Sequence, residues 1–213
     1  HDTGTKHWLG HTVYPEGQVE GEMALDVLAA HPSTARHVGF KLAQAFVADQ
    51  PPQALVTRLA NRFLASEGDL KAVTRELVTA DEFWQVERFG AKFKTPYHYL
   101  ISSLRALGAA TPPDVQPLLQ VLAQAGMPLY GAPTPDGYRD VASAWMNPEA
   151  LVQRVQFATS LSARRARQGE LPEADTLRLL DTLGPLLGAA TRETVAAEPV
   201  SMRLALLLSS PEF

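Results

Sequence analysis

The stretch Ser33–Val47, with the sequence STARHVGFKLAQAFV, decides the fold class of this chain. Large apolar side chains recur every four residues, at Val38, Leu42 and Phe46, and small residues form a stripe beside them, at Ala35, Gly39 and Ala43. This spacing predicts a helix with apolar surface around most of its circumference, so we expect neighbouring elements on several sides. We therefore predict that this central helix is mostly buried, with Leu42 and Phe46 in the core.

The residues before this helix indicate where it begins. His31-Pro32 ends any preceding helix, because proline has no N–H to continue the hydrogen-bond ladder. Ser33 or Thr34 supplies the side-chain oxygen that a helix N-cap needs. The sequence therefore predicts that one of these two hydroxyls caps the central helix.

Helical spacing continues on both sides of this segment, interrupted by proline, glycine and aspartate or asparagine. We predict helices over residues 19–30, 33–47, 52–66, 70–78, 96–107, 115–125, 148–167, 177–183 and 200–208, and shorter turns at 141–146 and 191–197. The expected fold class is all-α, a globular bundle of about nine or ten helices. We expect one helical domain over residues 1–213, with two halves joined near residues 90–112 as the alternative arrangement.

Composition limits the function classes. The chain has 213 residues, of which 46% are hydrophobic, so it is long and apolar enough to bury a sizeable core. Its formal net charge of −4 argues against a nucleic-acid binder driven by phosphate contacts. It has no cysteine, which excludes disulfides and thiol chemistry. No apolar run approaches the ~20 residues of a membrane-spanning helix.

Residues 1–17 are irregular and contain three of the six histidines, His1, His7 and His11. The segment either forms a small hairpin around Gly10 or runs as extended edges. We expect Trp8, Leu9 and Val13 to pack it against the main body. Histidine and carboxylate ligands bind zinc, but the spacing matches no zinc pattern, and His7 and His11 lie ~13 Å apart in an extended chain. We therefore assign no metal.

A second irregular segment is the better candidate for a binding site. Residues 126–140 contain three prolines and three glycines, which predicts a long loop rather than a helix. Aromatic faces beside a few charges are typical of carbohydrate or peptide grooves. The candidate binding residues are Tyr130, Asp136, Tyr138, Arg139 and Trp145, with Asp140 beside them and His31 in the turn before the central helix. The alternative is an Ω-like loop that packs its own aromatics, with His31 bonded to nearby backbone.

Two segments of the chain resemble one another. Residues 69–83 (DLKAVTRELVTADEF) and 199–213 (PVSMRLALLLSSPEF) align without gaps and end in the same pattern, Ser/Thr-x-x-Glu-Phe. The pattern indicates either a duplicated helical unit or convergent turn chemistry, since Ser/Thr-x-x-Glu is also a capping box.

Seven short motifs, spread from one end of the chain to the other, resemble one bacterial family. They are HDTGTK (1–6), HPSTAR (31–36), KL (41–42), GDL (68–70), PTPDGY (133–138), AWMNP (144–148) and SSPEF (209–213). The chain resembles the C-terminal portion of the family catalogued as domain of unknown function 1800. Members usually begin further upstream, so we expect this chain to be a fragment of a longer protein.

The resemblance implies a helical protein that is exported, and hence periplasmic or secreted. It also implies a partner, because the family is commonly encoded beside proteins similar to sulfatases or alkaline phosphatases. It supplies no catalytic residue and no cofactor. Our first hypothesis is an exported binding or assembly module that acts with a partner protein. The second is a hydrolase of an extracellular polymer, with its cleft between the histidine-containing N-terminal stretch and the 126–148 loop.

Overall fold

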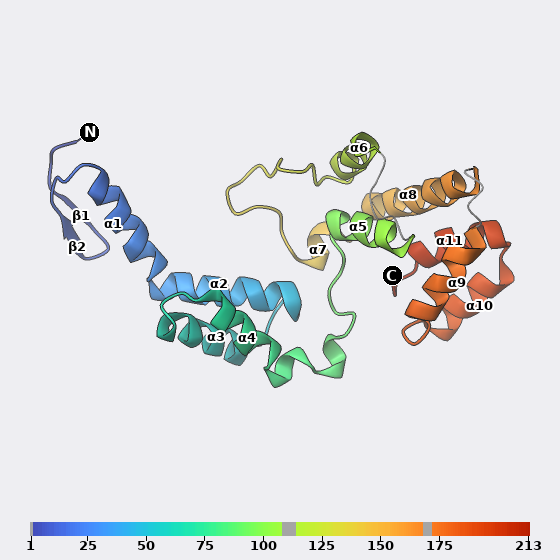
Figure 1. The fold of residues 1–213 in the computed structure, drawn as a ribbon, viewed down its shortest axis with the longest axis horizontal. Helices are drawn as coiled ribbons and strands as arrows, with labels where there is room; N and C mark the ends of the chain where they lie inside the picture. Colours follow the sequence, from blue (N-terminus) through green and yellow to red (C-terminus); the bar gives the residue numbers. More distant parts are fainter. Residues whose placement is uncertain (1, 108–113, 168–171) are drawn as a thin grey trace. The chain divides into compact units, whose positions relative to one another are not determined.

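The chain is predominantly helical in the computed structural model, which describes residues 2–107, 114–167 and 172–213 (Figure 1). The described residues form eleven α-helices, two short 3₁₀ turns and one two-stranded sheet, so the prediction of an all-α bundle is confirmed. The chain divides into two compact units, the first ending at Lys92 and the second beginning at Phe93. None of the described helices is long and apolar enough to cross a membrane.

The first unit begins with the small sheet and continues with four helices and two 3₁₀ turns. In chain order these are β1 (Lys6–Trp8), β2 (His11–Val13), α1 (Gln18–Ala29), α2 (Pro32–Phe46), α3 (Gln53–Ala65), α4 (Leu70–Val78), η1 (Asp81–Phe83) and η2 (Val86–Arg88).

The N-terminal segment is the hairpin that the sequence allowed. β1 and β2 pair antiparallel, and both residues of the connecting turn have positive φ, 46° at Leu9 and 80° at Gly10. Such a turn favours glycine at its second position, because glycine has no Cβ to clash at positive φ. Val13 is buried as expected, but Leu9 is 58% exposed, so its predicted packing is wrong. Leu9 points outward because it occupies the turn itself.

Glu20 ties the hairpin to α1. Its carboxylate accepts hydrogen bonds from the backbone N–H groups of Glu16 (3.0 Å) and Gly17 (3.2 Å) and pairs with Lys6 Nζ at 2.8 Å. The Lys6 ammonium is the main cause of the lowered pKa of Glu20. One carboxylate therefore satisfies free N–H groups at the helix start and anchors β1.

The core of the first unit lies where α2, α3 and α4 meet. The small stripe of α2 faces α3: Ala35 and Ala43 are fully buried, and Gly39 lies against Leu59. Large residues of α3 and α4 fill the space around the stripe, among them Leu55, Leu59, Val73 and Leu77.

The prediction that Phe46 belongs to this core is wrong. Leu42 is half-buried, and Phe46 is 59% exposed. Only small residues let two helix backbones approach closely, so α2 presents its alanine and glycine stripe to α3 and its larger side chains to the flanks. The helix α1 also forms as predicted, yet Leu25 is 69% exposed, and most of its apolar side chains lie at the surface.

The described residues of the second unit form seven helices. They are α5 (Pro96–Ala106), α6 (Gln116–Gln124), α7 (Ala142–Trp145), α8 (Pro148–Arg167), α9 (Pro172–Leu183), α10 (Ala189–Ala197) and α11 (Val200–Leu208). The last helix, α11, packs against α8 and α9 (Figure 1). Leu204, Leu207 and Leu208 are at most 1% exposed and belong to the hydrophobic core of this unit.

Candidate functional site

The loop between α6 and α7 is held by hydrogen bonds to its own backbone. Trp145 is buried, and its Nε1 donates to the carbonyl of Arg139 at 2.7 Å. The Tyr138 ring meets the indole edge-on, with centroids 6.1 Å apart, and its hydroxyl donates to the carbonyl of Pro128 at 2.7 Å. The structure thus brings Tyr138 and Trp145 together, and both use their polar atoms inside the loop.

The other candidate residues of the loop lie at its surface. Tyr130 is fully exposed and has a positive φ of 57°, which is unusual for a residue with a side chain. Asp136 and Arg139 are exposed, and Asp140 is half-buried. The loop therefore anchors two aromatic residues and displays a third on a constrained backbone.

His31, in the first unit, is the N-cap of α2. Its Nδ1 accepts a hydrogen bond from the backbone N–H of Ser33 at 3.1 Å. The prediction that Ser33 or Thr34 caps this helix is therefore wrong: Pro32 takes the first helical position, which proline favours, and leaves the cap to His31. Thr34 Oγ1 instead donates to the carbonyl of Leu28 at 2.6 Å, joining the end of α1 to α2.

The described histidines of the hairpin make contacts within the sheet. His7 Nδ1 lies 3.1 Å from Thr12 Oγ1, and the His11 ring lies 5.9 Å from the ring of Trp8. His1 lies outside the described residues. Among residues 2–107, 114–167 and 172–213, no group of three or more histidine, aspartate or glutamate side chains is placed to hold a metal ion.

Several aromatic residues surround a hollow of about 330 Å³ in the first unit. None of them was predicted as a binding residue from the sequence. We call this hollow the aromatic groove, and it is lined by Ala45, Phe46, Phe83, Trp84, Arg88, Phe89, Gly90 and Lys92. Three of its rings are largely exposed: Phe46 at 59%, Trp84 at 61% and Phe89 at 64%. Exposed large aromatics gathered around one hollow are typical of an interaction surface.

Most polar atoms of the aromatic groove already have partners. Trp84 Nε1 donates to the carbonyl of Val78 at 2.7 Å, and the ring packs edge-on against Phe83. Lys92 Nζ pairs with Asp49 at 2.6 Å. Arg88 differs, because its Nε is buried and has no hydrogen-bond acceptor within the described part of the chain. The groove therefore presents apolar rings and the side chain of Arg88.

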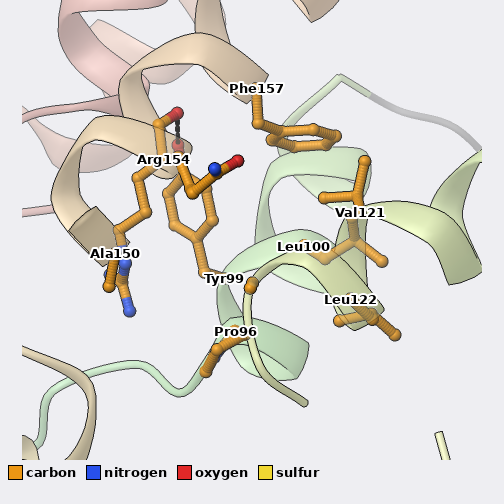
Figure 2. A pocket seen from close by; sticks show the side chains of 10 residues that line it. Pro96, Tyr99, Leu100, Val121, Leu122, Ala150, Arg154 and Phe157 are labelled. Atoms are coloured by element: carbon orange, nitrogen blue, oxygen red, sulfur yellow. Dashed lines mark hydrogen bonds between the residues drawn. The ribbon is translucent and has the colours of Figure 1, made fainter. Parts of the chain in front are cut away.

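A second constellation lies in the second unit, around Arg154 of α8 (Figure 2). The Arg154 guanidinium lies 4.0 Å from the centroid of the Phe93 ring and 4.8 Å from that of Tyr99. Its Nη2 donates to the carbonyl of Lys94, and the Tyr99 hydroxyl donates to the carbonyl of Arg154 at 3.2 Å. Lys94 Nζ lies over the Phe213 ring, 3.8 Å from its centroid.

Partial burial shifts the pKa of all three polar side chains in this cluster. It lowers the pKa of Lys94, and the charge of Arg154 lowers it further. It also lowers the pKa of Arg154 and raises the pKa of Tyr99 to about 12. Both cations remain charged at neutral pH only at a desolvation cost, while Tyr99 stays a neutral donor.

The space beside Arg154 is too small for an organic ligand. The gap has a volume of about 20 Å³, room for a single water molecule. Figure 2 shows it bounded by side chains from α5, α6 and α8, and its lining residues are Pro96, Tyr99, Leu100, Val121, Leu122, Ala125, Ala150, Gln153, Arg154 and Phe157. Any ligand of this cluster must therefore meet Lys94 and Arg154 from outside the gap.

Neither the aromatic groove nor the cluster around Arg154 could be predicted from a motif in the sequence. Phe46 and Trp84 are far apart along the chain, as are Lys94 and Arg154, and neither pair belongs to a motif. The one local signal is the alternation of lysine and phenylalanine at residues 92–94, directly before the helix start at Thr95-Pro96.

Comparison with known proteins agrees with the resemblance of the short motifs. The family model described as "Protein of unknown function (DUF1800)" matches residues 1–213, which is the whole chain. No curated protein and no solved structure matches the chain significantly. The chain therefore belongs to the DUF1800 family, whose function is unknown.

Proposed function

We propose that this chain is a binding module that docks a partner protein in the aromatic groove. The observation that carries the proposal is the exposure of Phe46, Trp84 and Phe89 around one hollow. Aromatic and arginine residues dominate the energetics of protein interfaces, because they bury large areas with few rotatable bonds. Arg88 lines the same hollow, and its guanidinium would pair with a carboxylate of the partner.

The polar atoms of the groove favour a peptide segment over a sugar. A sugar ring carries several hydroxyl groups, and each one that is buried needs a hydrogen-bond partner. The Trp84 donor is taken by Val78, and the Lys92 charge is neutralised by Asp49, so few polar partners are left. A segment with apolar side chains and one carboxylate matches this surface better.

The family resemblance suggests both the partner and the compartment. We propose a protein similar to sulfatases or alkaline phosphatases as the partner to test first, and export to the periplasm or the medium as the location. The absence of cysteine is compatible with an oxidising compartment, because the chain has no thiol to oxidise.

Binding of the sulfatase-like protein, measured by titration calorimetry, tests the groove directly. We expect Phe46→Ala and Phe89→Ala each to weaken binding by ~10-fold or more, as for interface aromatics. Because both rings are largely exposed, each change is expected to cost less than ~1 kcal/mol of stability, so the variants remain folded.

The control is Tyr130→Ala, which removes an exposed ring from the loop of the second unit. It leaves binding unchanged if the groove is the docking surface. If Tyr130→Ala abolishes binding while the groove variants bind normally, the groove proposal fails, and the loop residues Tyr130, Asp136, Tyr138, Arg139 and Trp145 are the surface to pursue.

A further inference from the structure

Lys94 and Arg154, which lie 60 residues apart in the chain, meet in the second unit. Arg154 reaches the backbone of Lys94 through Nη2, and both side chains are half-buried against aromatic rings. Contacts with aromatic faces hold a guanidinium or an ammonium in place without neutralising its charge. The pair is therefore a fixed concentration of positive charge.

Neither cation has a carboxylate within ion-pairing distance in the part of the chain that the structure describes. Three other cations of the described residues do have one: Lys6 pairs with Glu20 at 2.8 Å, Arg58 with Glu82 at 2.7 Å and Lys92 with Asp49 at 2.6 Å. The Lys94 ammonium also has no hydrogen-bond acceptor among the described residues. It makes a cation–π contact with the Phe213 ring. Among the described residues of this unit, no carboxylate therefore compensates the charges of Lys94 and Arg154.

We propose that Lys94 and Arg154 form an oxyanion-binding site for a phosphate or sulfate group. Arginine offers N–H donors in the guanidinium plane, which two oxygens of one oxyanion can accept, and the ammonium of lysine adds up to three more. The Lys94 carbonyl takes one donor of the guanidinium, Nη2, so an oxyanion would be bound by the remaining N–H groups of Arg154. The site differs from the aromatic groove in unit, residues and ligand chemistry, so it stands independently of the proposed function.

Charge and space select the class of oxyanion. Two uncompensated cations favour a dianion over a carboxylate, which carries one negative charge. The neighbouring gap of about 20 Å³ admits no ligand tail, so the group recognised is the anionic head itself. The site takes either the free ion or a phosphate or sulfate ester whose remainder projects into solvent.

The test is a titration of the intact chain with inorganic phosphate, sulfate, acetate and chloride at matched ionic strength. Thermal unfolding reports binding, because a ligand of the native state raises the midpoint with its concentration. Phosphate and sulfate are expected to raise the midpoint above the chloride reference, and acetate less. Phenyl phosphate distinguishes an ester from the free ion. If it binds as well as inorganic phosphate, the site accepts an ester; if it does not bind, the site is restricted to the free ion.

Three variants test whether stabilisation by phosphate depends on Lys94 and Arg154. Lys94→Met and Arg154→Gln are each expected to weaken phosphate binding at least ~10-fold, the loss typical of one charge-assisted hydrogen bond. Arg203→Gln is the matched control: it removes a cation of the same unit that contacts backbone carbonyls but no ring. Lys94→Met keeps an apolar stem over Phe213, so it tests the site even if Arg154→Gln is unstable. Equal stabilisation of Lys94→Met and the parent chain by phosphate would overturn the proposal.

Discussion

At the scale of single residues, Gly39 shows how the first unit is assembled. A Cβ added at this position would lie 3.1 Å from Leu59 Cβ and 3.2 Å from the carbonyl oxygen of Val56. Both atoms belong to α3 near its backbone, so they cannot move aside as the tip of a flexible side chain would. Gly39 is therefore required by the close approach of α2 and α3, although glycine is a poor helix former.

We predict that Gly39→Ala destabilises the chain by ~1–3 kcal/mol, the usual range for overpacking. The matched control is Gly21→Ala in α1, where nothing lies within 4 Å of the added Cβ. There the better helix propensity of alanine is expected to stabilise the chain by up to ~1 kcal/mol. Urea unfolding followed by circular dichroism measures both changes. The same sign for the two substitutions would contradict the close approach of α2 and α3.

At the scale of elements, each unit contains one of the two Ser/Thr-x-x-Glu-Phe segments, residues 79–83 in the first and 209–213 in the second. Thr79 and Ser209 are the C-terminal caps of α4 and α11, so the capping-box interpretation of these segments is wrong. Glu82 pairs with Arg58 of α3, and Glu212 accepts hydrogen bonds from Gly188 N at 2.9 Å and Thr191 Oγ1 at the start of α10. In both units the glutamate of this segment binds a neighbouring helix.

The phenylalanine that follows each of these glutamates also has the same role in the two units. Phe83 packs against the core of the first unit, and Phe213 packs against that of the second. A duplicated helical unit and convergent turn chemistry both account for this agreement.

Glu212 also makes stability depend on pH. The Gly188 N–H bond is the main cause of its lowered pKa, so the ionised form is stabilised in the folded state. A lowered folded-state pKa contributes stability above the ordinary glutamate pKa of ~4.3, and that contribution is lost as the pH falls through the folded value. We predict that Glu212→Gln loses ~1–2 kcal/mol at pH 7 and that this deficit shrinks below pH ~4.

Urea melts of the Glu212→Gln variant between pH 3 and 7 measure this dependence. Glu193→Gln, an exposed residue on α10, serves as the control and is expected to change stability little at any pH. A Glu212→Gln deficit that stays constant down to pH 3 would show that the carboxylate charge does not matter.

At the scale of the whole molecule, the chain has two separate hydrophobic cores, one in each unit. Leu59 is fully buried in the core of α2, α3 and α4, and Leu207 in that of α8, α9 and α11. Because no buried residue is shared by the two clusters, a cavity in one core removes contacts from that core alone. Local stability is therefore expected to respond unit by unit.

We predict that Leu59→Ala and Leu207→Ala each cost ~2–5 kcal/mol, as for other buried leucines. Hydrogen exchange followed by mass spectrometry is expected to show faster exchange in α2–α4 for Leu59→Ala and in α8, α9 and α11 for Leu207→Ala. Phe46→Ala is the exposed counterpart, with a small effect on exchange. Acceleration over both units by either leucine variant would indicate one cooperative unit instead of two.

The sequence by itself determined the helices, the long loop and several caps. Asp69 accepts from the backbone of Lys71 and Ala72 at the start of α4, and Asn147 accepts from Ala150 at the start of α8; both are cap-forming residues that stand directly before a helical segment of the sequence. These features are local, because a cap or a helix period depends on residues within one or two turns of each other. The candidate loop was likewise recognisable from its prolines and glycines.

Tertiary structure alone decided which face of each helix is buried and which distant residues meet. Phe46 looked like a core residue by its period, but close packing of α2 on α3 selected the alanine and glycine stripe and turned the phenylalanine outward. The aromatic groove and the Lys94–Arg154 pair join residues far apart in the chain, and no short-range pattern records such a contact. Side-chain volume and charge act through space, so their consequences appear only once the helices have packed.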